Sequence, residues 1–310
     1  MPGLLLRAGA IGGANVSTKI EWAEETWNPI TGCTKISEGC RNCYAERMAH
    51  RLAGRYGYPK DEPFKPGTWH LDKIDINLFR PRQRVFVCSM GDMFHEAVNI
   101  RGTEMRELFE CMALYPETTF TLLTKRPERM KACIDFIYGA DFPEIMPHIW
   151  LGVTTENQAQ YDKRWPILAT IPAAVRFVSY EPALGPLRIW TPPSCTLPDW
   201  VICGGETGPG ARPMHPGWVK SLRDQCVSAS VPFFFKQWGE WTATMGSHIP
   251  GLKMRICRGG EVEPLEYTKE TMPKRSFLMF GTECVVGRFG KKASGRLLDG
   301  QTFEQYPGPK

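Results

Sequence analysis

The sequence predicts an α/β fold in which parallel strands alternate with helices, either closed as a barrel or open as a doubly wound sheet. Short apolar runs recur along the chain, and helical patterns lie between them. Polar side chains that can bind or react end each of these runs. Because the carboxyl ends of barrel strands converge on one mouth, where barrel active sites are built, these side chains favour the barrel.

The apolar runs themselves are typical of parallel strands that are buried on both faces. A first β-like stretch, residues 18–32, precedes them. Helices are predicted at residues 103–116 and 217–229, where apolar residues such as Leu108 and Leu222 recur on one face. The runs cover residues 84–96, 118–130, 148–158, 175–187, 199–210 and 231–241.

The alternation of runs and helices stops near residue 243, which divides the chain of 310 residues into three parts. Residues 1–17 are apolar and glycine-rich, but Arg7 interrupts them and no clear cleavage site follows, so we expect a disordered leader and no signal peptide. Residues 18–243 form the α/β barrel. Residues 244–310 form a basic C-terminal extension that is partly irregular or contains β-strands, because no further strand and helix pairs follow.

Composition limits the classes of protein to which the chain can belong. A formal net charge of +5 is compatible with a polyanionic partner without requiring one. No stretch approaches the ~18 uninterrupted apolar residues of a transmembrane helix, so no membrane partner is expected. The 11 cysteines are mostly single and set in apolar runs, which indicates reduced thiols and a cytoplasmic location.

Candidate site residues end the apolar runs. Carboxylates and hydroxyls suit amino and hydroxyl donors, whereas cations suit carboxylates and phosphates. The alternative for each charged residue is an ion pair that closes the mouth of the barrel. The candidates are Ser89, Asp92, Thr124, Lys125, Arg126, Thr154, Glu156, Ser179, Glu181, Glu206, Thr207, Lys236 and Gln237.

Three cysteines, Cys33, Cys40 and Cys43, lie in the loop between the first β-like stretch and the helical pattern that follows it, with the spacing C-x6-C-x2-C. Zinc is one explanation, but no second cysteine pair appears, and His50 would lie about 10 Å farther along the helix. A buried cluster of thiols without metal is the second explanation. The third is a [4Fe–4S] cluster, in which three thiolates leave one iron open for a small molecule.

The motifs around these cysteines resemble known proteins. Three cysteines after the first strand are similar to those of the radical S-adenosylmethionine (SAM) superfamily, although there the commonest first interval is three residues. Motifs spread over residues 18–300 resemble the phage-type Gp37/Gp68 family, which is regarded as radical-SAM-like. They include TWNPITGCTKISEGCRNCYAERM, VFVCSMGDMFHE, LLTKRPERM, WLGVTTENQ, FVSYEPALGPL, WVICGGETGPGARPM and PFFFKQWGEW.

That resemblance implies a partial or modified TIM-type barrel, a [4Fe–4S] cluster on the three cysteines, and SAM as cofactor. The superfamily's Gly-Gly-Glu element is missing after the second strand, where Ser89 and Asp92 stand in its place. The GGET at residues 204–207 lies on a later strand and is either a separate site feature or a glycine turn. The amino group and ribose of SAM are expected to contact Ser89, Asp92, Thr154 and Glu156. The carboxylate of SAM or a substrate phosphate is expected to bind to Lys125 and Arg126. The substrate is expected to contact Glu181, Glu206 and Lys236.

We therefore expect a radical SAM enzyme that modifies or isomerises an amino-acid-bearing thymidine in phage DNA, with an external electron donor. A zinc-stabilised nucleic-acid-binding phage accessory protein without catalysis is one alternative, and a radical SAM enzyme acting on a peptide or small molecule is another. Basic residues interleaved with aromatic ones fit a nucleic-acid groove. They are Arg47, Arg51 and Arg55 on one helix face, and Arg288, Lys291, Lys292 and Arg296 with Trp238, Trp241 and Phe289.

Overall fold

The computed structural model describes residues 16–18, 20–71, 79–189, 196–243, 254–258, 261–264 and 284–308. Its main sheet has the strand order β1-β2-β5-β6-β7-β8-β9-β10. Strand β1 is antiparallel to β2, and every pairing from β2 onward is parallel. The strands are β1 (Val16–Ser17), β2 (Glu25–Trp27), β5 (Arg84–Val87), β6 (Thr119–Thr124), β7 (Ile149–Thr154), β8 (Arg176–Tyr180), β9 (Trp200–Gly204) and β10 (Phe233–Gln237).

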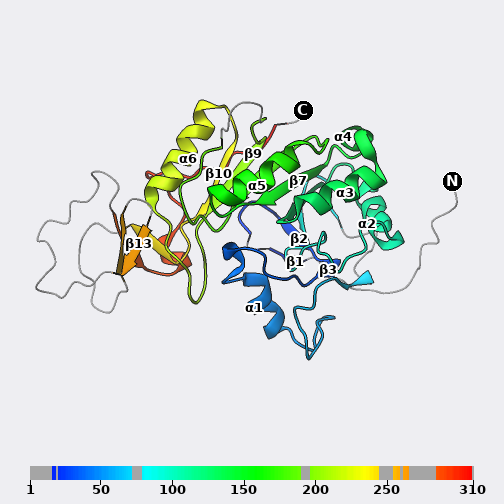
Figure 1. Cartoon of the computed structure of the whole chain (residues 1–310), viewed down its shortest axis with the longest axis horizontal. Coiled ribbons are helices and arrows are strands. Elements are labelled where there is room, and N and C mark those ends of the chain that lie inside the picture. The colour runs from blue at the N-terminus through cyan, green and yellow to red at the C-terminus, as the bar shows by residue number, and fades with distance from the viewer. Residues whose placement is uncertain are drawn as a thin grey trace, which may run out of the picture.

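This curled sheet is a half-barrel flanked by helices, as Figure 1 shows. The predicted α/β fold with parallel strands is confirmed, and the shape is compatible with a partial TIM-type barrel. Each apolar run contains one strand, from β5 to β10. The first β-like stretch contains β2 and also β3 (Ile30–Thr31), which pairs with β4 (Thr68–Trp69) in a separate small sheet.

Helices follow the parallel strands and cover one face of the sheet. In Figure 1, α3, α5 and α6 lie along this face, and α1 is separate from them. The predicted helices at residues 103–116 and 217–229 are α2 and α6. None of the helices in the described ranges is long and apolar enough to cross a membrane. The helices are α1 (Tyr44–Arg51), α2 (Thr103–Ala113), α3 (Pro127–Ile137), α4 (Phe142–Ile145), α5 (Gln158–Ala169), α6 (Pro216–Ser228) and α7 (Lys291–Ser294).

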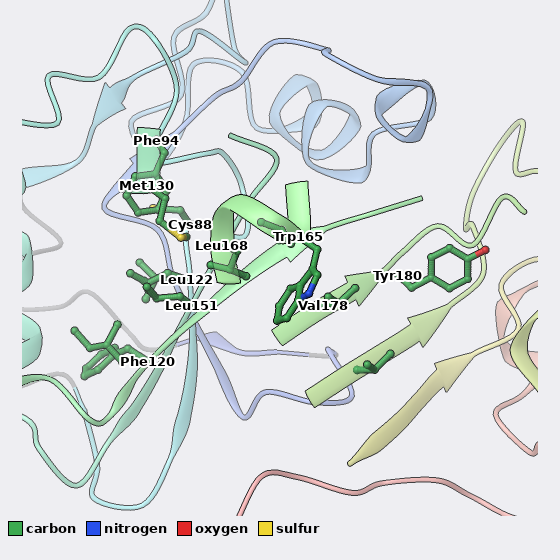
Figure 2. Close-up of a cluster of buried hydrophobic side chains, with 14 of the residues drawn as sticks. Cys88, Phe94, Phe120, Leu122, Met130, Leu151, Trp165, Leu168, Val178 and Tyr180 are labelled. Carbon is green, nitrogen blue, oxygen red and sulfur yellow. The ribbon is translucent and has the colours of Figure 1, made fainter. Parts of the chain in front are cut away.

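Both faces of the sheet are buried, which explains the continuous apolar runs. Val201 and Cys203 of β9 belong to the large core cluster that the helices cover, part of which Figure 2 shows. Their neighbours Trp200 and Ile202 belong to a second cluster, which also includes Trp22. Because successive side chains of a strand point to opposite faces, strand β9 supplies both clusters.

The C-terminal extension is more regular than expected. Strand β11 begins before the predicted boundary at residue 243 and joins three later strands in an antiparallel sheet with the order β11-β14-β12-β13 among the described residues. The expected irregularity is therefore not confirmed, and of the expected leader, residues 1–15 lie outside the described residues whereas residues 16 and 17 form β1. The strands are β11 (Trp241–Ala243), β12 (Met254–Arg258), β13 (Glu261–Pro264) and β14 (Cys284–Arg288).

The end of the chain returns to the main sheet beyond α7. Glu304 forms an antiparallel bridge with Phe234 of β10, and the N–H of Phe235 donates to the carbonyl of Phe303 at 2.9 Å. The indole N–H of Trp200 donates to the carbonyl of Gln305 at 2.9 Å. The tail thus covers the edge of β10, which would otherwise present unpaired backbone groups.

Trp200 provides a test of the packing on both faces of the main sheet. Its ring is fully buried and lies 5.5 Å from the ring of Phe177 and 5.9 Å from that of Trp150, measured between centroids. We expect Trp200→Ala to lower the free energy of unfolding by about 3–5 kcal/mol, measured by urea denaturation, because it leaves a large cavity. Leu114→Ala, at an exposed position, is the control and should change it by about 0.5 kcal/mol or less. Equal effects of the two substitutions would contradict the described packing.

Candidate functional site

A cavity of about 720 Å³ lies at the carboxyl ends of the parallel strands. Parallel pairing explains its composition, because each candidate that follows a strand reaches the same edge of the sheet. Among the predicted site residues, Glu156 and Ser179 are outside the lining of this described cavity. The predicted residues that line it are Cys33, Cys40, Cys43, Ser89, Asp92, Thr124, Lys125, Arg126, Thr154, Glu181, Glu206, Thr207, Lys236 and Gln237.

The three cysteines line this cavity from one loop and are all half-buried. Cys40 ends a 3₁₀ turn, Glu38–Cys40, and its Sγ lies 3.8 Å from Oγ of Ser37. Cys43 caps the N-terminus of α1, where its Sγ accepts a hydrogen bond from the N–H of Glu46 at 3.5 Å. By contrast, Cys111, Cys133, Cys203 and Cys226 are buried in the large core cluster and do not line the cavity, whereas the buried Cys88 belongs to this cluster and also lines the cavity. The loop therefore supplies the half-buried sulfur atoms of the cavity.

Cations at the end of β6 influence two of these thiols. Burial, followed by the nearby Asp92 carboxylate, raises the pKa of Cys33 to about 11, against the opposing effect of the Arg126 guanidinium. Burial also acts to raise the pKa of Cys40, but the Lys125 ammonium and backbone hydrogen bonds outweigh it, so the pKa of Cys40 lies below its ordinary value. Because thiolates are the metal-binding form of cysteine, a neighbouring positive charge suits a ligand role.

The donor chemistry of this loop fits an iron–sulfur cluster. As placed, the described His, Cys, Asp and Glu side chains form no group of three or more that is ready to hold a metal ion. The thiols nevertheless share one cavity wall, and thiolates are the usual ligands of such clusters. The zinc alternative finds no fourth ligand in His50, which is exposed on α1 and does not line the cavity.

Asp92 and Arg126 are bound to each other inside the wall of the cavity. The Arg126 Nη1 atom lies 3.1 Å from Oδ2 of Asp92, and both side chains are buried. The hydroxyl of Thr124 donates to both carboxylate oxygens of Asp92 at 2.9 Å. Arg126 also donates to the exposed Glu96 from Nε, at 2.8 and 2.9 Å. Both residues are thus engaged within the protein, which differs from the expectation that they meet SAM.

Ion pairs also occupy the expected substrate side of the cavity. The Nζ atom of Lys236 lies 2.6 Å from Oε2 of Glu181, and Oε1 of Glu206 lies 2.6 Å from Nη2 of Arg212. Hydrogen bonds from Arg212 and from the Asn42 amide hold the pKa of Glu206 below its usual value, although burial opposes them. These pairs match the alternative in which charged residues close the mouth of the barrel, yet all three predicted residues still line the cavity.

Glu156 serves the protein interior instead of the cavity. It is fully buried, and its Oε2 lies 2.9 Å from Nη1 of Arg164, which is buried as well. Its Oε1 accepts a hydrogen bond from the N–H of Gly39, inside the cysteine loop, at 3.2 Å. A Cβ at Gly39 would lie 2.9 Å from Cδ of Glu156, so the two segments are in close contact. The SAM contact expected of Glu156 stays a prediction, whereas the described contacts of Glu156 support the cysteine loop.

The GGET segment at residues 204–207 contains a close backbone contact at a glycine and also contributes a residue to the cavity. A Cβ at Gly205 would lie 2.0 Å from the carbonyl oxygen of Trp238, so a side chain cannot fit there. The N–H of Gly205 donates to the carbonyl of Gln237 at 2.9 Å, which joins the ends of β9 and β10. This close approach requires glycine, and it places Glu206 directly on the cavity.

Sequence reasoning did not identify several residues that complete the site. Asn42 donates from Nδ2 to Glu206 at 3.0 Å, and Glu21 pairs with Lys291 at 2.9 Å. Asn42, Glu21 and Lys291 line the cavity. The position of Asn42 between two of the cysteines was a usable signal. Nothing local in the sequence connects Arg212 to Glu206 or Lys291 to Glu21.

Two of the three aromatic residues predicted to line a nucleic-acid groove, Trp238 and Trp241, lie in the interior, whereas Phe289 is half-buried. Trp238 and Trp241 are buried, and their indole N–H groups donate to the carbonyls of Leu297 and Ala211. They cannot stack on bases, so this part of the prediction is wrong. Arg47 of the predicted basic stripe donates to backbone carbonyls at Asn42 and Thr207. Ion pairs within the chain engage the predicted cations Arg288, Lys291 and Arg296 of the C-terminal extension.

Comparison with known proteins gives one match. A family described as "Protein of unknown function (DUF5131)" matches residues 17–307. The matched range extends from β1 to the tail that covers β10. No curated protein and no solved structure matches the chain.

The structural assignment of Glu156 can be tested by stability. Glu156→Ala leaves the charge of Arg164 buried without its partner, and we expect it to lower the free energy of unfolding by about 3–5 kcal/mol in urea denaturation. Asp135→Ala is the control, because it breaks the exposed ion pair with Lys131 and should cost about 1 kcal/mol or less. A Glu156→Ala protein that is as stable as the control but has lost SAM binding would instead support the cofactor role.

Proposed function

The chain belongs to the DUF5131 family, and we propose that it is a radical SAM enzyme whose [4Fe–4S] cluster is held by Cys33, Cys40 and Cys43. The observation that carries this proposal is the presence of three half-buried thiols, from one loop, at the carboxyl ends of the parallel strands. When bound, the cluster would supply the electron that cleaves SAM to a carbon radical able to remove a hydrogen atom from the substrate.

Residues around the cysteines have the chemistry to bind SAM. Lys125 lines the cavity close enough to Cys40 to affect its thiol, and a cation there suits the carboxylate of SAM. Ser89 and Thr154 line the same cavity and offer hydroxyls to the amino group and ribose. The cavity volume of about 720 Å³ falls within the range of about 300–1,000 Å³ that is usual for cofactor sites.

The substrate in this proposal binds beside the ion pairs of β8 to β10. Glu181 and Lys236 are each mostly buried in the wall of the cavity, and their charges are paired. Such paired groups orient a polar substrate while the surrounding wall excludes water from the reacting atoms.

Following the phage resemblance, we infer that the substrate is an amino-acid-bearing thymidine in DNA, whose C–N link becomes a C–C link. A base in duplex DNA would have to be flipped out of the stack to reach the cavity.

Metal content tests the cluster assignment. After anaerobic purification we expect about four irons and four sulfides per wild-type chain, and loss of both in Cys40→Ala, because the cluster requires all three thiolates. Iron and sulfide analysis with an absorption spectrum measures this. Cys226→Ala is the control, since Cys226 is buried on α6 and should leave the iron content unchanged.

One zinc per chain without iron would contradict the radical mechanism. That result would favour the zinc-stabilised binding protein.

Substrate dependence tests the reaction. With dithionite as the electron donor and SAM present, we expect modified phage DNA to increase the formation of 5′-deoxyadenosine severalfold, measured by liquid chromatography, because a bound substrate supplies the hydrogen atom. Unmodified DNA of the same sequence is the control. SAM cleavage that modified DNA does not change would contradict the DNA substrate and would favour a peptide or small molecule.

A further inference from the structure

Arg126 is the side chain that reaches from the wall of the cavity to a cysteine sulfur. Its Nη1 atom donates to Sγ of Cys33 at 3.4 Å. Its Nη2 atom donates to the hydroxyl and to the carbonyl of Thr34, at 3.1 and 3.4 Å. Arg126 therefore donates hydrogen bonds to two consecutive residues at the start of the cysteine loop, Cys33 and Thr34, although it lies 93 residues from Cys33 in the sequence.

The hydrogen bonds of Arg126 use its full set of donors. A guanidinium has five N–H groups. Within the described residues, Nε donates to Glu96, Nη1 to Asp92 and Cys33, and Nη2 twice to Thr34. Each of these donors is thus engaged within the protein, so the neighbouring Lys125 is the cation that the cavity offers to the carboxylate of SAM or to a substrate phosphate.

The orientation of Arg126 is fixed by buried neighbours. Asp92 is held by the hydroxyl of Thr124, and the same hydroxyl oxygen accepts the backbone N–H of Arg126 at 2.9 Å. Arg126 is the residue immediately before α3, so both its backbone and its side chain are attached to the end of β6. Only 4% of Arg126 and 5% of Asp92 are exposed, so this ion pair is largely shielded from solvent.

We propose that Arg126 is a positioning residue that orients Cys33 and raises the reduction potential of the cluster bound there. This inference rests on the proposed function. Reduction adds a negative charge to the cluster and its thiolates. A fixed cation that donates an N–H bond to one ligand sulfur stabilises the reduced form more than the oxidised form. The nearby Asp92 and Glu96 carboxylates orient the guanidinium, while Arg126 alone among these three groups donates to the sulfur.

Substitutions of Arg126 distinguish an effect on the reduction potential of the cluster from a loss of folding. Arg126→Met removes the charge and the donors, and we expect the equilibrium constant for cluster reduction to fall about tenfold, which is a midpoint about 59 mV more negative for one electron. Arg126→Lys keeps the charge without the fork of donors and should restore part of the shift. Midpoint potentials are measured by anaerobic redox titration, monitored by electron paramagnetic resonance, on protein with its cluster reconstituted.

Arg129→Met is the matched control. Arg129 lies in the first turn of α3, the helix that Arg126 precedes, and donates to the carbonyls of Phe94 and Val98 at 2.8 and 2.6 Å, so it holds the segment that carries Asp92 and Glu96. The structure gives it no contact with the described cysteines of the loop, and we expect the midpoint potential of Arg129→Met to equal that of the wild type.

If Arg126→Met folds, either of two outcomes would overturn the inference. One is an Arg126→Met potential equal to that of the wild type. The other is an equal shift in Arg126→Met and Arg129→Met, which would indicate general loosening of the segment. If Arg126→Met does not fold, an Arg126→Lys potential equal to that of the wild type, with unchanged iron content, also overturns it. A wild-type chain that holds no iron would contradict the proposed function itself, which distinguishes that failure from the failure of Arg126.

Discussion

The parallel pairing of β2 and β5 to β10 is the constraint on which the rest of the structure depends. Strands that run in one direction bring their carboxyl ends to one edge, so residues from distant parts of the chain line one cavity. The same pairing buries both faces of the sheet. Helices cover one face, and the second cluster, to which the tail contributes Tyr306, covers the other. The cavity therefore lies on a closely packed support.

Two buried ion pairs connect this support to the cysteine loop. Arg126, paired with Asp92 at the end of β6, donates to Cys33. Glu156, paired with Arg164 after β7, accepts the N–H of Gly39. In each pair the partner compensates for burial of the charge, and the remaining hydrogen-bonding capacity is directed to the loop. The loop has little regular structure of its own, and these contacts hold it together with the hydrogen bonds of Thr34 to His95 and of Asn42 to Glu206.

The parallel strands β5 to β10, the helices α1, α2 and α6 and the residue types of the cavity could be predicted from the sequence, because they follow from local patterns such as apolar runs and cysteine spacing. The partners of the charged residues could not. Glu156 and Glu181 have the same side chain and each lies just beyond the end of its strand, but Glu156 is buried against Arg164 and Glu181 lines the cavity. The strand pairing of the small antiparallel sheet could not be predicted either, since β11 pairs with β14 across a long separation in sequence. Aromatic residues near basic ones indicated a groove, although packing places Trp238 and Trp241 in the interior.

In the proposed cluster, three cysteines leave one iron open for SAM. Mössbauer spectroscopy of the iron-enriched protein, recorded before and after addition of SAM, can distinguish this iron from the others. We expect one iron to differ from the other three, and SAM to change the spectrum of that iron alone. A spectrum that SAM leaves unchanged, or protein that takes up no iron under reconstitution, would contradict the proposal.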